Sequence, residues 1–204
     1  MTRINRRETI TLTAAAIVAS LAVIVAASAS RRVEAPKPPV RKQMTRAEQI
    51  ARGKYMVTIG GCHDCHTPWI MQPDGKPGPD MSRALSGHPM QFPITEQNQF
   101  KSDRWGYAGA ATNTAFSGPW GVSFAANLSP DIHTGTGIWT FDIFKNTIRN
   151  GRHWGVGRPL NPPMPWFNYR HMTDEDLAAV FAYTRTLKPI HNEVQQPIPP
   201  AAQK

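Results

Sequence analysis

The residues best suited to do chemistry lie together in a short stretch of the sequence. It has two cysteines, Cys62 and Cys65, and His66 follows the second one directly. Two thiols at this spacing reach the two vinyl groups along one edge of a porphyrin, and the adjacent histidine supplies an axial nitrogen to the iron. The three positions meet a single geometric requirement. Together they predict covalent attachment of one haem c.

Two other kinds of site also use a Cys-x-x-Cys pair. A thioredoxin-like redox pair opens a helix after a strand, whereas here a helix is predicted before the motif. A zinc site formed by Cys62, Cys65 and His66 would need further ligands, and the sequence has no second cysteine pair and no histidine pair at ligand spacing. Haem attachment is therefore favoured over both alternatives. His63, inside the motif, is expected to be solvated.

The iron of a haem needs a sixth ligand, or an open position where chemistry takes place. A methionine thioether stabilises ferrous iron and is the ligand expected of an electron carrier. Met164 is the candidate, because prolines on both sides stiffen its loop and the loop leads directly into the last predicted helix. Met81 and Met90 are weaker alternatives. Three histidines are possible second axial ligands, although surface roles are favoured for them: His88, His153 and His171.

The elements that position these residues are predicted from helix caps and apolar periodicity. The 19 prolines and 15 glycines indicate a loop-rich chain with short helices. Three helices are expected, over residues 45–59, 140–150 and 173–188. Thr45 with Glu48, and Thr173 with Asp176, stand at capping-box positions of the first and last helices. Residues 69–126 are predicted to be mostly irregular.

Charge is unevenly distributed along the chain, which limits the choice of partner. The formal net charge is +9, but the basic residues are concentrated in 31–54, and residues 55–204 are nearly neutral. The sequence contains no basic patch interleaved with aromatic residues, so nucleic acid is not an expected partner. A basic stretch beside an apolar segment is better suited to anionic lipid head groups.

The N-terminus has the layout of an export signal. Arginines precede an uncharged apolar run over residues 10–29, which ends in small residues suited to cleavage. The run is also just long enough to span a bilayer. We therefore expect a signal peptide or an uncleaved membrane anchor over 1–30 and a Pro/Arg/Lys-rich tether over 31–44. Either interpretation places the domain on the periplasmic side, tethered to the cytoplasmic membrane or soluble after cleavage.

Several segments resemble monohaem class I c-type cytochromes, and most of all the cytochrome c modules of dehydrogenase electron-transfer subunits. These segments are residues 60–68, 127–131 with 134–139, 163–166 with Tyr169, and 172–183. The resemblance implies a mainly α cytochrome c fold over residues 45–190, in which few short helices and long loops wrap round one covalently bound haem. Residues 191–204 are expected to form a flexible tail.

The resemblance also implies roles for single residues. It implies these haem contacts: Cys62 and Cys65 as thioether sites, His66 and Met164 as axial ligands, and Pro68, Asn127 and Trp139 in the haem pocket. The carbonyl of Pro68 is expected to accept the Nδ1 proton of His66. Gly53 is expected near Tyr183, where the first and last helices cross closely.

The predicted function is single-electron transfer by one haem c, with redox proteins as partners. A dehydrogenase, a quinol-oxidising complex or a terminal oxidase would serve as such a partner. The chain is not expected to be an enzyme, because Met164 would fill the sixth position of the iron. A peroxidase-like enzyme or a haem-based gas sensor would require that position to be open or easily vacated.

Overall fold

The computed structural model describes residues 43–97 and 104–200, which belong to one unit of the chain. The predicted leader, residues 1–30, lies outside the described residues, and so does nearly all of the predicted tether, residues 31–44. Among the helices that the structure describes, none combines the length and the apolar character needed to cross a membrane.

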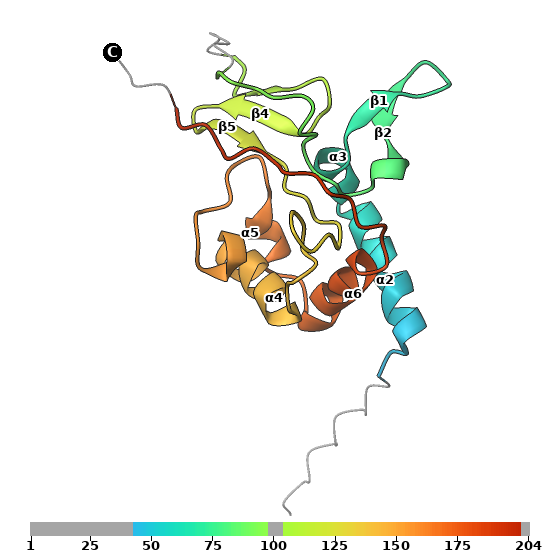
Figure 1. Ribbon diagram of the computed structural model, residues 1–204. Helices are drawn as coiled ribbons and strands as arrows, with labels where there is room; N and C mark the ends of the chain where they lie inside the picture. The colour runs from blue at the N-terminus through green and yellow to red at the C-terminus, as the bar shows by residue number, and fades with distance from the viewer. Residues whose placement is uncertain (1–42, 98–103, 201–204) are drawn as a thin grey trace, which may run out of the picture. The chain divides into compact units, whose positions relative to one another are not determined.

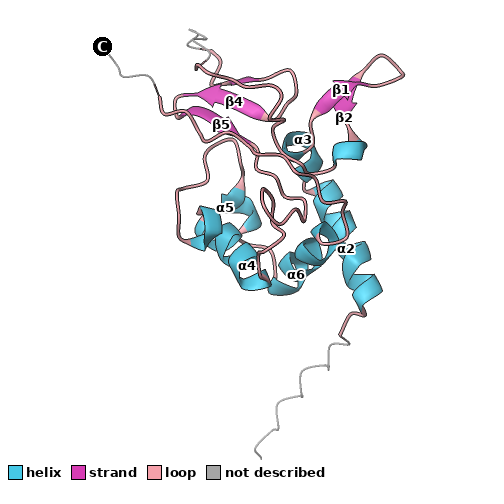
Figure 2. Ribbon diagram, viewed as in Figure 1, coloured by secondary structure: helices cyan, strands magenta, loops and turns pink. Residues whose placement is uncertain are grey.

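Helices dominate the described fold, and short strands and long loops connect them (Figures 1 and 2). In chain order the elements are α2 (Arg46–Ile59), α3 (Cys62–His66), β1 (Trp69–Met71), β2 (Pro77–Pro79), η1 (Met81–Arg83), β3 (Ala108–Gly109), β4 (Ala115–Gly118), β5 (Gly121–Phe124), α4 (Phe141–Asn150), η2 (His153–Gly155), α5 (Trp166–Tyr169) and α6 (Asp174–Thr184). The prediction of a mainly α fold with few short helices is confirmed.

Helix α2 begins and ends where its sequence predicts. The Thr45 hydroxyl accepts the backbone N–H of Glu48 at 3.2 Å, and the Glu48 carboxylate accepts the backbone N–H of Thr45 at 2.7 Å. This reciprocal pair is a capping box, which satisfies two N–H groups that the first helical turn leaves open. The helix stops at its C-cap, Gly60.

Helices α2 and α6 cross at close range, as the resemblance implies, and Figure 1 shows them side by side. A Cβ atom at Gly53 would overlap the backbone carbonyl of Ala179 and would lie 2.8 Å from Cβ of Tyr183. Glycine is therefore required at the crossing. Beside it, Val57 and Leu85 pack with Tyr183 in one buried apolar cluster.

Helix α6 begins at its predicted N-cap, Thr173, whose hydroxyl accepts the backbone N–H of Asp176 at 3.1 Å. The carboxylate of Asp176 forms an ion pair with Arg52 of α2, and so ties the two helices together. The helix ends at Thr184, short of the predicted end at 188, because the following backbone hydrogen bonds are of the tighter i to i+3 type.

Helix α4 lies against α6 and has the predicted caps. Its N-cap is Thr140, and its C-cap is Gly151 in the left-handed conformation, with φ of 62°. The buried side of α4 presents Phe144 and Ile148, which form a second apolar cluster with Leu177 of α6. This cluster supports the loop and the short helix α5 that precede α6.

Two small antiparallel sheets occupy part of the stretch that was expected to be irregular. Strands β1 and β2 form a hairpin, and β3, β4 and β5 form a second sheet in that order. The strands are only two to four residues long, and all four residues of β5 are buried. Ala115, Val122 and Phe124 give this sheet its own apolar cluster.

The C-terminal segment packs against the sheet, so the prediction of a flexible tail over 191–204 is wrong for its described part, 191–200. Ile198 pairs with Val122 of β5 through two backbone hydrogen bonds, at 2.8 and 3.0 Å. Asn192 is completely buried, and its amide donates to two loop carbonyls at 2.7 and 2.9 Å. This Pro/Gln-rich segment has no apolar periodicity that would predict packing. Its polar side chains nevertheless form hydrogen bonds with backbone groups of neighbouring loops, and these bonds hold it in place.

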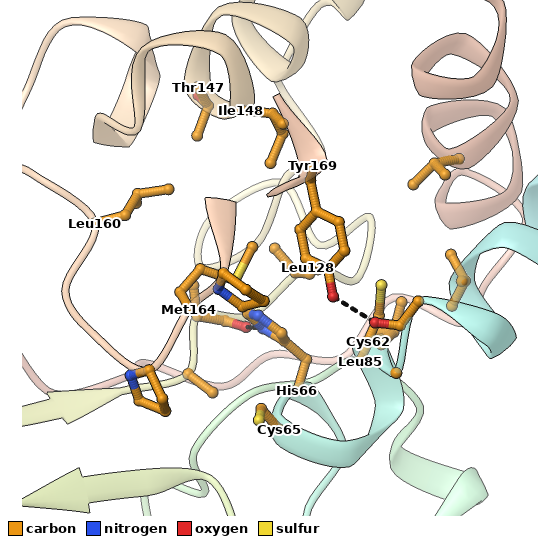
Figure 3. Close-up of a pocket in the computed structure, with 18 of the residues that line it drawn as sticks. Cys62, Cys65, His66, Leu85, Leu128, Thr147, Ile148, Leu160, Met164 and Tyr169 are labelled. Atoms are coloured by element: carbon orange, nitrogen blue, oxygen red, sulfur yellow. Dashed lines mark hydrogen bonds between the residues drawn. The ribbon is translucent and has the colours of Figure 1, made fainter. Parts of the chain in front are cut away.

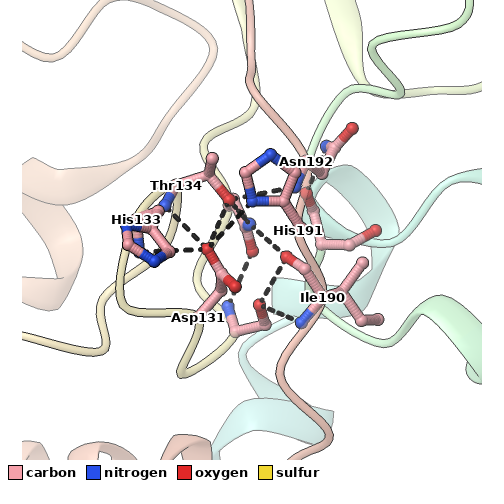
Figure 4. A network of polar contacts seen from close by, with 9 residues as sticks. Asp131, His133, Thr134, Ile190, His191 and Asn192 are labelled. Carbon is pink, nitrogen blue, oxygen red and sulfur yellow. Dashed lines mark hydrogen bonds and ion pairs between the residues drawn. The ribbon is translucent and has the colours of Figure 1, made fainter.

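A polar network fixes the start of this segment (Figure 4). The Asp131 carboxylate accepts the backbone N–H of Thr134 at 2.7 Å and its hydroxyl at 2.8 Å, and lies 3.7 Å from Nδ1 of His191. The Thr134 hydroxyl in turn accepts the backbone N–H of Asn192 at 2.9 Å. The hydrogen bonds from Thr134 hold the pKa of Asp131 below its usual value.

Candidate functional site

A cavity of about 320 Å³ lies in the middle of the described fold (Figure 3). Its walls come from α2, α3, α4, α6, strands β4 and β5, and the loop that leads into α5. Most of the lining side chains are aliphatic, aromatic, sulfur-containing or proline. Such a cavity suits a ligand with a large apolar body, and it has the size of ordinary ligand pockets.

The Cys-x-x-Cys-His motif forms the short helix α3 on one wall of this cavity. The chain turns from α2 into α3 at Gly60 and Gly61, and Gly61 adopts a φ of 65°, which favours glycine. The hydroxyl of Tyr169 donates a hydrogen bond to the carbonyl of Gly60 and fixes the turn from across the cavity. Both Cys62 and Cys65 line the cavity as a result.

The surroundings of the two thiols argue against a redox-active cysteine pair. Burial raises the pKa of Cys62 to about 11 and also raises the pKa of Cys65, and the nearby Asp64 carboxylate acts in the same direction. Thiol–disulfide exchange uses cysteines whose pKa is lowered. The motif also follows a helix rather than a strand. The thioredoxin-like alternative therefore finds no support in the local structure.

A hydrogen bond to the backbone fixes the ring of His66 and leaves its other nitrogen available as a ligand. Its Nδ1 lies 2.8 Å from the carbonyl oxygen of Ala126, which accepts only, so Nδ1 carries the proton. The other ring nitrogen, Nε2, keeps its lone pair. Burial lowers the pKa of His66, with the Ala126 hydrogen bond opposing this shift, which keeps the ring neutral at neutral pH. A neutral, oriented imidazole is the form that binds a metal.

Pro68 does not take the role that the resemblance implied. The Nδ1–H of His66 donates to the backbone carbonyl of Ala126 instead. The carbonyl of Pro68 accepts the backbone N–H of Asp80 at 2.8 Å. The reason lies in the backbone after α3, because the chain becomes extended at Thr67 and carries the Pro68 carbonyl toward the β1–β2 hairpin. Pro68 is also not among the residues lining the cavity.

Asn127 likewise has a structural place beside the cavity rather than in its wall. Its side-chain nitrogen donates to the Thr134 hydroxyl at 3.1 Å and to the carbonyl of Ile190 at 2.8 Å, and its side-chain oxygen accepts the backbone N–H of Ser129 at 3.0 Å. Its neighbours in sequence, Ala126 and Leu128, line the cavity instead. Asn127 thus holds the C-terminal segment to the loop that carries the acceptor for His66.

Met164 lies in the wall of the same cavity as His66, although 98 residues separate them in the sequence, and Figure 3 shows both side chains in that pocket. The hydroxyl of Ser123 on β5 donates to the carbonyl of Pro162 at 2.6 Å and anchors the Met164 loop to the sheet. On its other side, Met164 packs against the apolar cluster that contains Phe144.

Other methionines and histidines that the sequence left open lie elsewhere. Met81 and Met90 are 55% and 46% exposed and do not line the cavity. His88 is completely buried, contrary to its predicted surface role, because the hydroxyl of Thr114 and the carbonyl of Phe92 satisfy its two ring nitrogens at 2.9 and 2.8 Å.

The two remaining histidines of interest differ from each other. His171 is exposed, as predicted. His153 lines the cavity and its ring lies edge-on to Trp139, at 5.7 Å between centroids. Trp139, the predicted pocket residue, also lines the cavity.

His63, inside the motif, is partly buried rather than solvated, and its Nδ1 lies 2.8 Å from the hydroxyl of Thr67.

The sheet wall of the cavity has no signal in the sequence. Phe116 of β4 and Ser123 and Phe124 of β5 line it. Such short strands, one of them buried on both faces, carry no alternating pattern that would place them. Tyr169 was matched by the resemblance, but its hydrogen bond to the motif turn needed the structure, because the partners are 109 residues apart.

The donor set fits a covalently held haem better than a bare metal ion. Two thiols and one oriented imidazole share a wall of an apolar cavity, and a thioether lies in the same cavity. Across the described residues, no group of three or more His, Cys, Asp or Glu side chains converges in a way that could hold a metal ion. The zinc alternative thus lacks a set of protein ligands there.

Comparison with known proteins points to dehydrogenase electron-transfer subunits. No protein-family model matches the chain. It is 27% identical over 175 residues to a nicotinate dehydrogenase subunit of Pseudomonas putida, covering 86% of this chain and 12% of that protein. It is 28% identical over 134 residues to the gluconate 2-dehydrogenase cytochrome c subunit of Pantoea cypripedii, and 29% over 142 residues to the fructose dehydrogenase cytochrome subunit of Gluconobacter japonicus.

The last two matches cover 66% and 69% of this chain and 22% of each relative. The chain therefore spans less than a quarter of the length of these curated relatives. The gluconate and fructose dehydrogenase relatives are cytochrome subunits rather than catalytic subunits, which agrees with the prediction of an electron-transfer protein. The chain is thus similar to a cytochrome c-type electron-transfer module of dehydrogenases.

Proposed function

We propose that this chain carries one haem c, bound covalently through Cys62 and Cys65, and transfers single electrons. The observation that carries the proposal is the apolar cavity that brings the Cys-x-x-Cys-His motif together with Met164. The haem, when bound, supplies an iron centre that cycles between its ferric and ferrous states. The similarity to dehydrogenase cytochrome subunits supports the same function.

In this proposal each residue of the site has a defined task. Cys62 and Cys65 would hold the haem through thioether bonds. His66 would offer its Nε2 to the iron, while the carbonyl of Ala126 fixes the ring through Nδ1. Met164 would offer its sulfur as a further ligand, from a loop that Ser123 anchors. The surrounding apolar residues exclude water, which favours the less charged ferrous state.

The cellular setting of the proposal rests on the sequence and on the relatives. We propose export to the periplasmic side by residues 1–30, with the apolar run 10–29 as a membrane anchor or as part of a cleaved signal peptide. A dehydrogenase is the proposed electron donor, since the relatives belong to dehydrogenases. A quinol-oxidising complex or a terminal oxidase is an alternative redox partner. Contact with such partners would be small and transient.

The test is a set of absorption spectra from protein produced with haem-maturation machinery. Wild-type protein is expected to contain one haem per chain that resists extraction, and its oxidised spectrum is expected to show the weak long-wavelength band from methionine sulfur to iron. Met164→Ala should lose this band and should bind carbon monoxide in the reduced form. Met81→Ala removes an exposed methionine that does not line the cavity, and should keep the band.

Each part of the proposal has its own contrary result. Wild-type protein without covalent haem would contradict haem attachment. A band that survives in Met164→Ala would contradict Met164 as a ligand. Fast carbon monoxide binding by reduced wild-type protein would favour an enzyme or a gas sensor over a carrier.

A further inference from the structure

The cavity has one charged corner, formed by Arg158 with His153 and Trp139. Arg158 is the sole residue with a permanent charge among the described residues that line the cavity. The backbone N–H of His153 donates to the carbonyl of Arg158 at 2.9 Å, so the two residues face each other across a narrow loop. The ring of His153 contacts Trp139 at 5.7 Å between centroids.

The hydrogen-bond donors of this corner have spare capacity. Arg158 makes one long hydrogen bond, at 3.3 Å, from its guanidinium to the carbonyl of Pro159. No described carboxylate forms an ion pair with it, and no described residue accepts a hydrogen bond from the indole N–H of Trp139. Desolvation lowers the pKa of Arg158, and desolvation together with the nearby charge of Arg158 lowers the pKa of His153. The corner thus lacks a negative partner.

The loop that carries Arg158 continues along the side of the cavity opposite Cys62. Figure 3 shows Leu160, two residues after Arg158, across the cavity from Cys62. A haem has an apolar macrocycle with its two vinyl groups at one edge and two propionate carboxylates toward the other. Attachment of the vinyl edge at Cys62 and Cys65 therefore directs the carboxylates toward the loop that carries Arg158.

We propose that Arg158, with His153 and Trp139, binds the propionate carboxylates of the haem. This inference rests on the proposed function, because it requires a haem held at Cys62 and Cys65. A guanidinium presents parallel N–H groups that match the two oxygens of a carboxylate, and Arg158 presents its guanidinium at the rim of the cavity, where it is exposed. Arg158 is thereby a positioning residue, which fixes the tilt of the macrocycle opposite its covalent edge.

The inference is tested by measuring the ionisation of the propionates directly. Cells fed 5-aminolevulinate with carbon-13 in its carboxyl group produce haem labelled at the propionate carboxyls. The carbon-13 shifts of the reduced holoprotein are then followed against pH. In wild-type protein, at least one propionate is expected to have a pKa one or more units below that of a free propionate, since a cation within contact distance lowers a carboxylate pKa by about 1–3 units.

Variants separate charge from loop structure. Arg158→Gln should raise that propionate pKa by about 1–3 units, and Arg158→Lys should raise it less, because the charge stays. Arg152→Gln is the matched control, since Arg152 lies in the same loop, donates to the carbonyl of Gly157 at 2.8 Å and does not line the cavity. It should leave the propionate pKa unchanged. The carbon-13 label reports on the propionate carboxyls themselves, so the measured titration is that of the propionates and not that of His153.

The possible failures are distinguishable. Wild-type protein with covalent haem and two propionates of ordinary pKa would overturn this inference and leave the proposed function intact. An Arg158→Gln protein with the wild-type propionate pKa would overturn it as well. Wild-type protein without covalent haem would refute the proposed function itself, and this inference with it.

Discussion

Gly53→Ala tests whether the close crossing of α2 and α6 is a requirement of the fold. The added Cβ would overlap the carbonyl group of Ala179 and lie 2.8 Å from Cβ of Tyr183, where ordinary contact begins at 3.4 Å. The obstacle is backbone and Cβ, which cannot move away by a change of rotamer. Overpacking of this kind costs about 1–3 kcal/mol, while alanine gains about 1 kcal/mol of helix propensity over glycine.

Because the clash involves backbone, we expect the cost to lie at the upper end and the free energy of unfolding to fall by about 2 kcal/mol. For a domain of this size the midpoint of thermal unfolding should fall by roughly 4–8 °C. Circular dichroism of the purified holoprotein during heating and in denaturant measures both quantities. Gly106→Ala is the control, since a Cβ there meets no atom within 4 Å. A Gly53→Ala protein as stable as wild type would refute the steric argument.

Two further predictions concern the C-terminal segment. Asn192→Ala should lower the free energy of unfolding by about 2–3 kcal/mol, because it leaves buried loop carbonyls without a donor; an unchanged denaturant midpoint would contradict this. The lowered pKa of Asp131 means that its contribution to stability is present above its unfolded-state pKa and is lost as the pH falls through the lower folded-state value. Melting temperatures between about pH 6 and pH 2.5 should therefore fall less for Asp131→Asn than for wild type, and parallel curves would show that Asp131 contributes nothing.

The helices could be predicted because their signals are local. Thr45 and Glu48 satisfy each other within one turn, and Thr140 and Thr173 cap helices whose apolar residues recur at helical spacing. Each of these signals involves residues no more than a few positions apart. The same holds for the Cys-x-x-Cys-His motif, whose chemistry follows from its spacing alone.

What the sequence did not predict depends on partners that are distant in the chain. His88 is buried because Thr114, 26 residues later, satisfies one of its ring nitrogens. Asn192 is buried because it bonds to loops that lie more than 100 residues earlier. The strands are too short to show alternation, and the fully buried β5 has none to show.

The two site residues whose roles differ, Pro68 and Asn127, were inferred from resemblance alone. A residue can match a family's sequence pattern although another residue makes the expected contact. Here the carbonyl of Ala126, rather than that of Pro68, accepts the hydrogen bond from His66. No local property of Ala126 marks it, because the acceptor is a backbone carbonyl that every residue possesses. Met164 could be proposed because prolines surround it, a feature visible in the sequence.

The late position of several wall residues has a consequence for how the protein matures. Chains emerge from the ribosome N-terminus first, so Cys62 and Cys65 are made about a hundred residues before Met164 and longer still before Pro197, which completes the cavity wall. Until that last part packs, the cavity lacks the wall that Pro197 contributes. The thiols are therefore present in the chain well before the cavity around them is complete, and a wall residue is added when the C-terminal segment pairs with β5.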